Sequence, residues 1–186
     1  MVKKIGIGFA VVLGVFALVV ATRPAAFHIE RSTTIDAPPG VVFPLVNDFH
    51  AWTRWSPYEN RDPSMTREFA GATSGEGAIY SWEGNDDIGA GRMTLTRSVP
   101  NERVAIRLEF SRPMTATNQV EFVFQASGDD TRVVWGMDGH NGFLGKLISL
   151  FLDMDAMVGG DFEAGLAAMK AAAEADARPA DPQQGD

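Results

Sequence analysis

Histidines are the residues of this chain best suited to acid–base chemistry, because imidazole titrates near neutral pH. There are three of them, and His50 lies two residues after Asp48, so the two could act as a base and its orienting carboxylate. His28 falls on the polar phase of an alternating segment, and His140 stands in a Gly- and Asn-rich stretch typical of a turn. No Ser-His-Asp spacing, metal-ligand cluster or glycine-rich phosphate loop accompanies them. The sequence therefore predicts no catalytic constellation, no metal site and no cofactor.

Three other polar side chains share strand faces with apolar residues. Tyr80 carries a hydroxyl beside its ring, Arg97 is in phase with Leu95, and Asn118 is in phase with Phe122. Such groups could orient a ligand bound to an apolar surface. An isolated buried charge is costly, so the alternative for Arg97 is a solvated position at the end of its strand.

Composition limits the classes of partner. The chain has 186 residues, of which 45% are hydrophobic, which is enough for one globular domain with a substantial core. A net charge of −8 argues against a nucleic-acid partner, because binding to phosphates needs a basic face. With no cysteine, the chain has no disulfide, thiolate metal site or cysteine nucleophile.

An uncharged apolar run, Ile5–Ala21, follows Lys3 and Lys4 and ends before Arg23. Its 17 residues span about 26 Å as a helix, slightly less than a hydrocarbon core of about 30 Å. We expect a single membrane-spanning helix. A signal peptide cleaved after Val19-Val20-Ala21 and a buried helix are the alternatives. The preceding lysines predict a cytoplasmic N-terminus, so the domain would lie outside the cytoplasm, either anchored or exported as a soluble protein.

Alternation of apolar and polar residues predicts about six to seven strands joined by short turns. These segments are Phe27–Ile35, Thr66–Ala70, Ala78–Glu83, Arg92–Val99, Arg103–Phe110, Val120–Phe124 and Val133–Met137. Alternation with period two means that one face is buried and the other solvated, which favours antiparallel pairing. The sequence thus predicts one antiparallel sheet with a single apolar face.

Helical spacing appears before and after most of the strands. Pro38-Pro39 suits a helix start, and Pro44 would keep that helix short. From Leu147 to Ala177 apolar residues recur at helical spacing, and Gly159-Gly160 should mark a kink, a hinge or a close backbone approach. The fold class is α+β, with a membrane segment over 1–24, a domain over 25–177 and a disordered tail over 178–186.

Several short motifs, in this order and spacing, resemble the SRPBCC or START-like helix-grip superfamily, in particular its polyketide cyclase/dehydrase and lipid-transport type. They are Ile35-Asp36-Ala37-Pro38, Val42-Phe43, Asn47-Asp48, Trp52 to Trp55-Ser56-Pro57, Val134–Met137 with Gly139, and Met157–Phe162 with Gly165-Leu166. The resemblance covers roughly residues 27–175. It implies a curved antiparallel sheet that grips the long C-terminal helix around an apolar cavity.

Residues on the apolar faces would line such a cavity. The expected lining residues are Trp55, Tyr80, Trp82, Leu95, Arg97, Phe110, Asn118, Phe122, Trp135, Met154, Phe162 and Leu166. The alternative for each is that it fills the core. The leading hypothesis is a domain that binds a hydrophobic small molecule or lipid at a membrane surface. Two other hypotheses stay open: a cyclase- or dehydratase-like enzyme that uses Tyr80, Arg97 or His50, and a ligandless module that binds an envelope protein.

Overall fold

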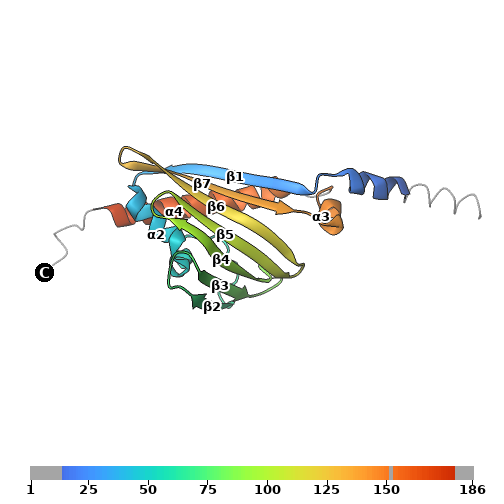
Figure 1. Cartoon of the computed structure of the whole chain (residues 1–186), viewed down its shortest axis with the longest axis horizontal. Helices are drawn as coiled ribbons and strands as arrows, with labels where there is room; N and C mark the ends of the chain where they lie inside the picture. The colour runs from blue at the N-terminus through green and yellow to red at the C-terminus, as the bar shows by residue number, and fades with distance from the viewer. Residues whose placement is uncertain (1–13, 151–152, 179–186) are drawn as a thin grey trace, which may run out of the picture.

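The computed structural model describes residues 14–150 and 153–178, which form a seven-stranded sheet with helices on one face (Figure 1). The strands are β1 (Ala26–Ile35), β2 (Thr66–Gly71), β3 (Ala78–Glu83), β4 (Ala90–Val99), β5 (Arg103–Arg112), β6 (Ala116–Ser127) and β7 (Asp130–His140). The helices are α2 (Pro39–Asn47), the 3₁₀ helix η1 (Phe49–Arg54), α3 (Phe143–Ile148) and α4 (Met154–Ala177). The α+β class and the number of strands are confirmed.

The sheet has the order β1-β7-β6-β5-β4-β3-β2, and every neighbouring pair is antiparallel. Strands β2 to β7 follow one another as a meander, whereas β1 pairs with the last strand. All ten residues of β1 pair with β7, from Ala26 opposite His140 to Ile35 opposite Thr131. The first and last strands of the domain are therefore held together, and β1 and β2 form the two edges.

Helices α2, η1 and α4 cover the same face of the sheet, which we call the inner face. Pro39 occupies the first turn of α2, where a missing N–H leaves no broken hydrogen bond. Two tryptophans after α2 return to its last turn: Trp52 Nε1 donates to the Val46 carbonyl at 3.0 Å and Trp55 Nε1 to the Leu45 carbonyl at 2.7 Å. Their rings are thus buried with both indole N–H groups satisfied, and they seal this end of the core.

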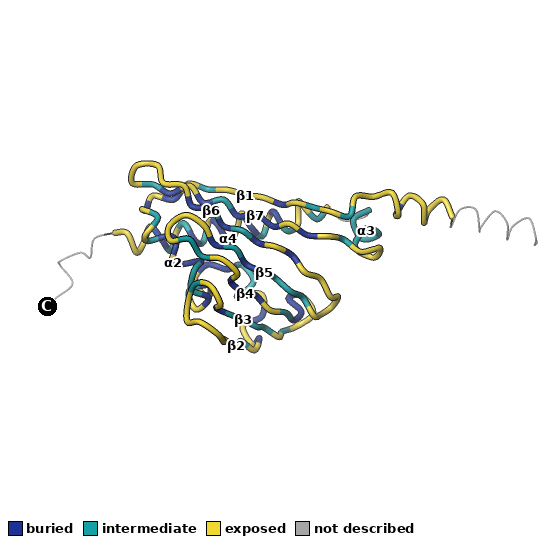
Figure 2. The backbone as a smooth tube through the Cα atoms, in the orientation of Figure 1, coloured by how far each residue is buried: buried dark blue, intermediate teal, exposed yellow. Residues whose placement is uncertain are grey.

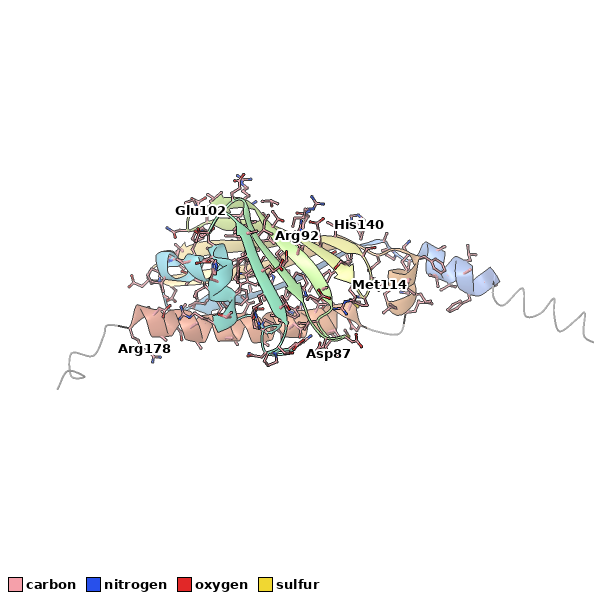
Figure 3. The ribbon with its side chains drawn as sticks, turned by 90° about the horizontal axis from the view of Figure 1, so that it is seen from below. Asp87, Arg92, Glu102, Met114, His140 and Arg178 are labelled. Carbon is pink, nitrogen blue, oxygen red and sulfur yellow. The ribbon has the colours of Figure 1, made fainter. Side chains whose placement is uncertain are left out.

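Ion pairs fix the position of α4, which runs along the length of the domain beneath the strands (Figure 3). Arg31 of β1 reaches Asp155 at 2.9 Å and Glu163 at 2.8 Å. At the other end, Arg54 of η1 makes a two-pronged contact with Asp176, at 2.8 and 2.9 Å. Solvent-exposed pairs of this kind contribute little stability each, so their main effect is to set the position of the helix.

The C-terminal helical region differs from the prediction of one helix interrupted at Gly159-Gly160. The helical structure is interrupted earlier, between α3 and α4. Asp153 caps α4 by accepting a hydrogen bond from Ala156 N at 3.0 Å. Gly159 and Gly160 both lie inside α4. The expected close approach is found at Gly159, where a Cβ would lie 2.0 Å from Arg31 Nη2. Glycine there lets the guanidinium group lie directly on the helix.

Among the helices of the described residues, none has both the length and the apolar character needed to cross a membrane. The predicted spanning helix falls only partly within them. Residues 14–22 are helical, whereas residues 5–13, the first part of the predicted span, lie outside the described residues. Most of the predicted disordered tail, residues 179–186, also lies outside them.

Candidate functional site

The middle of the inner face is filled by stacked aromatic rings. Trp135 of β7 lies flat on Phe162 of α4, with ring centroids 4.0 Å apart and planes 9° apart. Phe122 stacks on the same indole at 4.9 Å, and Trp55 meets its edge at 5.5 Å. Each such contact adds about 0.5–1.5 kcal/mol to the free energy of apolar burial. Four of the expected lining residues therefore pack against one another as core.

Leu95 and Leu166 are also fully buried in this core. The close approach of α4 depends on Gly165, because a Cβ there would lie 2.8 Å from Trp135 Cζ3 and 3.0 Å from Pro57 Cδ. Within the described residues, Trp135 Nε1 is the one buried side-chain polar atom that has no hydrogen-bond partner. Surrounding atoms cover this nitrogen, so it belongs to the packed core rather than to an open surface.

The part of the inner face near the N-terminal end of α4 is less completely covered than the part around Trp135. Five of its side chains are half-buried or polar, and we call them the inner patch: Phe27, Trp82, Leu108, Phe110 and Asn118. The strand register places them side by side, because Leu108 pairs with Asn118 and the neighbouring Gly91 pairs with Phe110. Half-buried aromatic side chains on an inward-facing surface are typical of a ligand-binding wall.

Two glycines shape the inner patch. A Cβ at Gly91 would lie 2.5 Å from Cη2 of Trp82, so the indole covers the bare backbone of β4. The same ring meets the edge of Phe110 with centroids 5.6 Å apart. A Cβ at Gly139 would lie 2.4 Å from the Phe27 ring and in collision with Asn118. Larger residues at either glycine would displace the side chains of the patch.

Asn118 is the polar group of the inner patch. It is 8% exposed, and within the described part of the chain its Nδ2 donates only to the sulfur of Met137, at 3.7 Å. Sulfur is a weak acceptor, so the amide retains hydrogen-bonding capacity. Asn118 can therefore orient a polar group of a molecule that covers the surrounding apolar side chains.

Tyr80 lies deeper, in a small polar cluster. Its hydroxyl donates to Glu59 Oε1 at 2.8 Å, and Arg67 Nε donates to the other carboxylate oxygen at 2.8 Å. Burial, and then the adjoining Glu59 carboxylate, raise the pKa of the Tyr80 phenol above its ordinary value. Tyr80 thus stays protonated as a donor and ties β3 to the loop after η1, which gives it a structural role.

The expectation that Arg97 shares a face with Leu95 is wrong. A bulge in β4 inserts Thr96, so that Leu95 pairs with Ile106 but Arg97 pairs with Ala105, on the outer face. Arg97 is exposed there. One extra residue in a strand moves every later side chain to the opposite face, and the guanidinium group stays in solvent.

His50 and Asp48 do form the expected pair, with Nδ1 and Oδ1 2.7 Å apart. The same oxygen accepts from the His50 backbone N–H, so Asp48 caps η1, and the exposed imidazole stacks on Phe69 at 4.1 Å. The Phe69 ring packs on both His50 and Tyr80, at 4.1 and 5.2 Å, but His50 bonds to Asp48, Tyr80 bonds to Glu59, and Arg97 faces outward. The three groups considered for acid–base catalysis are therefore not brought together.

Helix α4 supplies the opposite wall. Met154 and Val158 precede Phe162 by two turns and one turn, and residues four apart lie on the same helix face. Both are half-buried, unlike the fully covered Phe162. Side chains along α4 therefore change from fully buried at Phe162 to half-buried at Val158 and Met154, as the side chains on the strands do.

Sequence reasoning missed Phe27, Leu108 and Val158 as members of this region. Phe27 and Leu108 belong to alternating segments that were recognised, but alternation shows only which face a residue occupies. It does not show how completely that face is covered. The signal that could have located the patch is the pair of glycines, Gly91 and Gly139, among large inward-facing residues.

Solved structures with this fold cover most of the chain. They include the Zhui aromatase/cyclase from Streptomyces sp. R1128 (17% identity, TM-score 0.59, 82% of this chain and 96% of that one). The Aha1 dimer from Colwellia psychrerythraea gives 16% identity and a TM-score of 0.57, over 80% of this chain and 96% of that one. A protein from Chromobacterium violaceum gives 12% and 0.58, over 79% and 96%. At these identities the likeness shows the fold alone.

No curated protein matches the sequence. Residues 26–174, from the start of β1 nearly to the end of α4, match the family described as polyketide cyclase / dehydrase and lipid transport. The match includes every strand of the sheet and both walls of the inner patch. The chain therefore belongs to the polyketide cyclase / dehydrase and lipid transport family, within the START-like helix-grip superfamily.

Proposed function

We propose that this domain binds one hydrophobic small molecule or lipid against the inner patch. The observation that carries the proposal is the contrast between the two halves of the inner face. Around Trp135 the rings stack in full contact, whereas Trp82, Leu108 and Phe110 stay half-buried beside a polar amide. Covering such apolar area contributes about 25 cal/mol per Å² removed from water.

The arrangement favours binding over catalysis. Among the residues that the structure describes, the inner patch combines apolar side chains with the neutral amide of Asn118. The nearby Tyr80 is engaged by Glu59 and remains a protonated donor. The ligand would thus be held by apolar burial and oriented by one or two hydrogen bonds. Membership of a family that includes lipid transport supports the same class of ligand.

We further propose that the N-terminal segment attaches the domain to a membrane, outside the cytoplasm. The support is the sequence, in which two lysines precede the apolar run Ile5–Ala21 and a single arginine follows it. Cleavage after Ala21 would instead release a soluble exported domain. N-terminal sequencing of the protein recovered from both the membrane fraction and the soluble fraction distinguishes these two products.

A fluorescent apolar probe tests the binding site. Titration of the full chain with 1-aminoanthracene should show saturable binding to one site. Phe110→Ala should weaken this binding roughly tenfold, equivalent to about 1.4 kcal/mol, because the ring is a wall of the patch. The matched control is Phe69→Ala on the edge strand β2, whose ring packs on His50 and Tyr80 rather than on a residue of the patch, so the affinity should stay unchanged. Equal affinities for both variants and the parent protein would contradict the proposed site.

A further inference from the structure

We infer that α3 and the last turns of the N-terminal helix form one surface that rests on a lipid bilayer. The inference builds on the membrane attachment proposed above and identifies a second membrane contact within the folded domain. Six exposed apolar side chains make up this surface, which we call the apolar end: Val15, Phe16, Leu18, Val19, Phe143 and Leu144. Phe143 is 61% exposed and Leu144 50%, and a group of exposed apolar side chains, unlike single scattered ones, marks an interaction surface.

The two parts of the apolar end lie together at one extremity of the molecule (Figures 1 and 2). Lys146 Nζ of α3 donates to the Ala21 carbonyl at 3.4 Å, and Asn141 N donates to the Ala25 carbonyl at 2.7 Å. Val20 is fully buried although its neighbours on the helix are exposed, so the last turn packs on the fold. These contacts hold α3 beside the last turn of the N-terminal helix.

The level of α3 along this helix determines its environment in a membrane. The apolar run ends at Ala21, and Arg23 follows, so the boundary between hydrocarbon and water must lie near these residues. Because Lys146 contacts the Ala21 carbonyl, α3 lies at that same boundary. Its two exposed apolar side chains would then enter the interfacial layer.

Charge also distinguishes α3 from the rest of the domain. The whole chain has a net charge of −8, yet residues 141–150 contain one lysine and no acidic residue. A segment that combines Phe, Leu and Lys without carboxylates is typical of a helix lying in a membrane interface. The apolar run also continues through residues 5–13 in the sequence, so one occupant, a bilayer, would cover both parts.

Strands β1 and β7 connect the apolar end to the inner patch, where the ligand is proposed to bind. Phe27 near the start of β1 and Gly139 near the end of β7 are paired, and these strands lead directly to the N-terminal helix and to α3. Seating the apolar end on a bilayer would bring the half-buried part of the inner face toward the membrane. An apolar ligand could then pass between bilayer and domain without crossing bulk water.

Because the chain contains no cysteine, single-cysteine variants can report the depth of chosen positions. We would place the full chain in nanodiscs of phosphatidylcholine and phosphatidylglycerol and label Leu144→Cys, Val15→Cys and Phe69→Cys with an environment-sensitive nitrobenzoxadiazole dye. Phe69 is the matched control, since it is an exposed apolar residue on the edge strand β2. Unchanged thermal unfolding of each variant would establish that the label leaves the fold intact.

The expected result is blue-shifted emission, quenched by doxyl-labelled lipids, for Leu144→Cys and Val15→Cys, with water-like emission for Phe69→Cys. Water-like emission for Leu144→Cys beside a lipid-quenched Val15→Cys would overturn this inference and leave the membrane attachment standing. Water-like emission at both positions would overturn the attachment as well. A blue shift for Leu144→Cys that follows protein concentration and resists lipid quenching would assign α3 to a contact between chains, which also overturns the inference.

Discussion

Substitution of Gly165 by alanine tests how closely α4 packs on the sheet. The added methyl group would lie 2.8 Å from Trp135 Cζ3 and 3.0 Å from Pro57 Cδ, and both partners are rigid rings. Trp135 cannot move away easily, because Phe122 stacks on it at 4.9 Å and Phe162 at 4.0 Å. Relief of the clash therefore requires α4 itself to shift.

The expected magnitude comes from comparing Gly165→Ala with a control on the same helix. Gly160→Ala introduces the same methyl group in α4, where no described atom beyond its chain neighbours and the adjacent helix backbone lies within 4 Å, so it should stabilise the protein by up to about 1 kcal/mol through helix propensity. Gly165→Ala gains the same propensity but overpacks the core, at a cost of about 1–3 kcal/mol. Because the propensity term cancels, the difference between the two variants isolates the overpacking cost.

Urea denaturation followed by tryptophan fluorescence measures this difference. Gly165→Ala should unfold at a lower urea concentration than Gly160→Ala, with the two slopes equal. If both variants are equally stable, then the indole of Trp135 does not lie against the α4 backbone. The description of the inner face around Trp135 as fully packed would then be wrong.

Three further predictions concern the ionisable groups. The chain has two tyrosines, Tyr58 and Tyr80, and burial is the main cause that raises the pKa of each phenol. An ultraviolet titration of the folded protein should therefore show no tyrosinate at pH 10.0, the ordinary pKa of tyrosine. A tyrosinate signal at that pH without unfolding would contradict the burial of these side chains. Tyr80→Phe removes a hydrogen bond to the Glu59 carboxylate and should lower the free energy of unfolding by about 1.5–3 kcal/mol in urea denaturation, whereas an unchanged midpoint would show that the hydroxyl is not engaged. Hydrogen bonding to Arg31 lowers the pKa of Asp155, so the stability that this carboxylate contributes is present above its ordinary pKa of 3.8 and is lost as the pH falls below that value. Asp155→Asn should therefore be less stable than the parent protein near neutral pH and equally stable in strong acid. A difference in stability that stays constant across pH would refute this linkage.

The sheet could be predicted because most of its inner-face residues are apolar and most of its outer-face residues are polar. Segments such as Ala78–Glu83 and Arg103–Phe110 place large apolar residues at every second position, and the observed strands contain them. A bulge breaks that rule without leaving a mark in the sequence. Thr96 looks like any polar strand residue, so the shift of Arg97 to the outer face follows only from the observed pairing with β5.

The candidate site was only partly predictable, because sequence periodicity identifies a buried face but not how well it is filled. Phe122 and Phe110 show the same alternation, yet the first is stacked between other rings and the second is half-buried. The difference arises from α2, η1 and Trp55, which cover one end of the inner face. Such coverage depends on contacts between segments far apart in the sequence, which local patterns do not report.

Native mass spectrometry of the full chain, released from nanodiscs made with the lipids of its own membrane, tests the central claim most directly. The parent protein should retain one apolar molecule per chain. Phe110→Asp should lose it, because a carboxylate in the inner patch makes apolar burial unfavourable. Phe69→Asp, outside the patch, should retain it. A parent protein that emerges at its bare mass, or a Phe110→Asp variant that carries the same molecule, would contradict the proposal that the inner patch is the binding site.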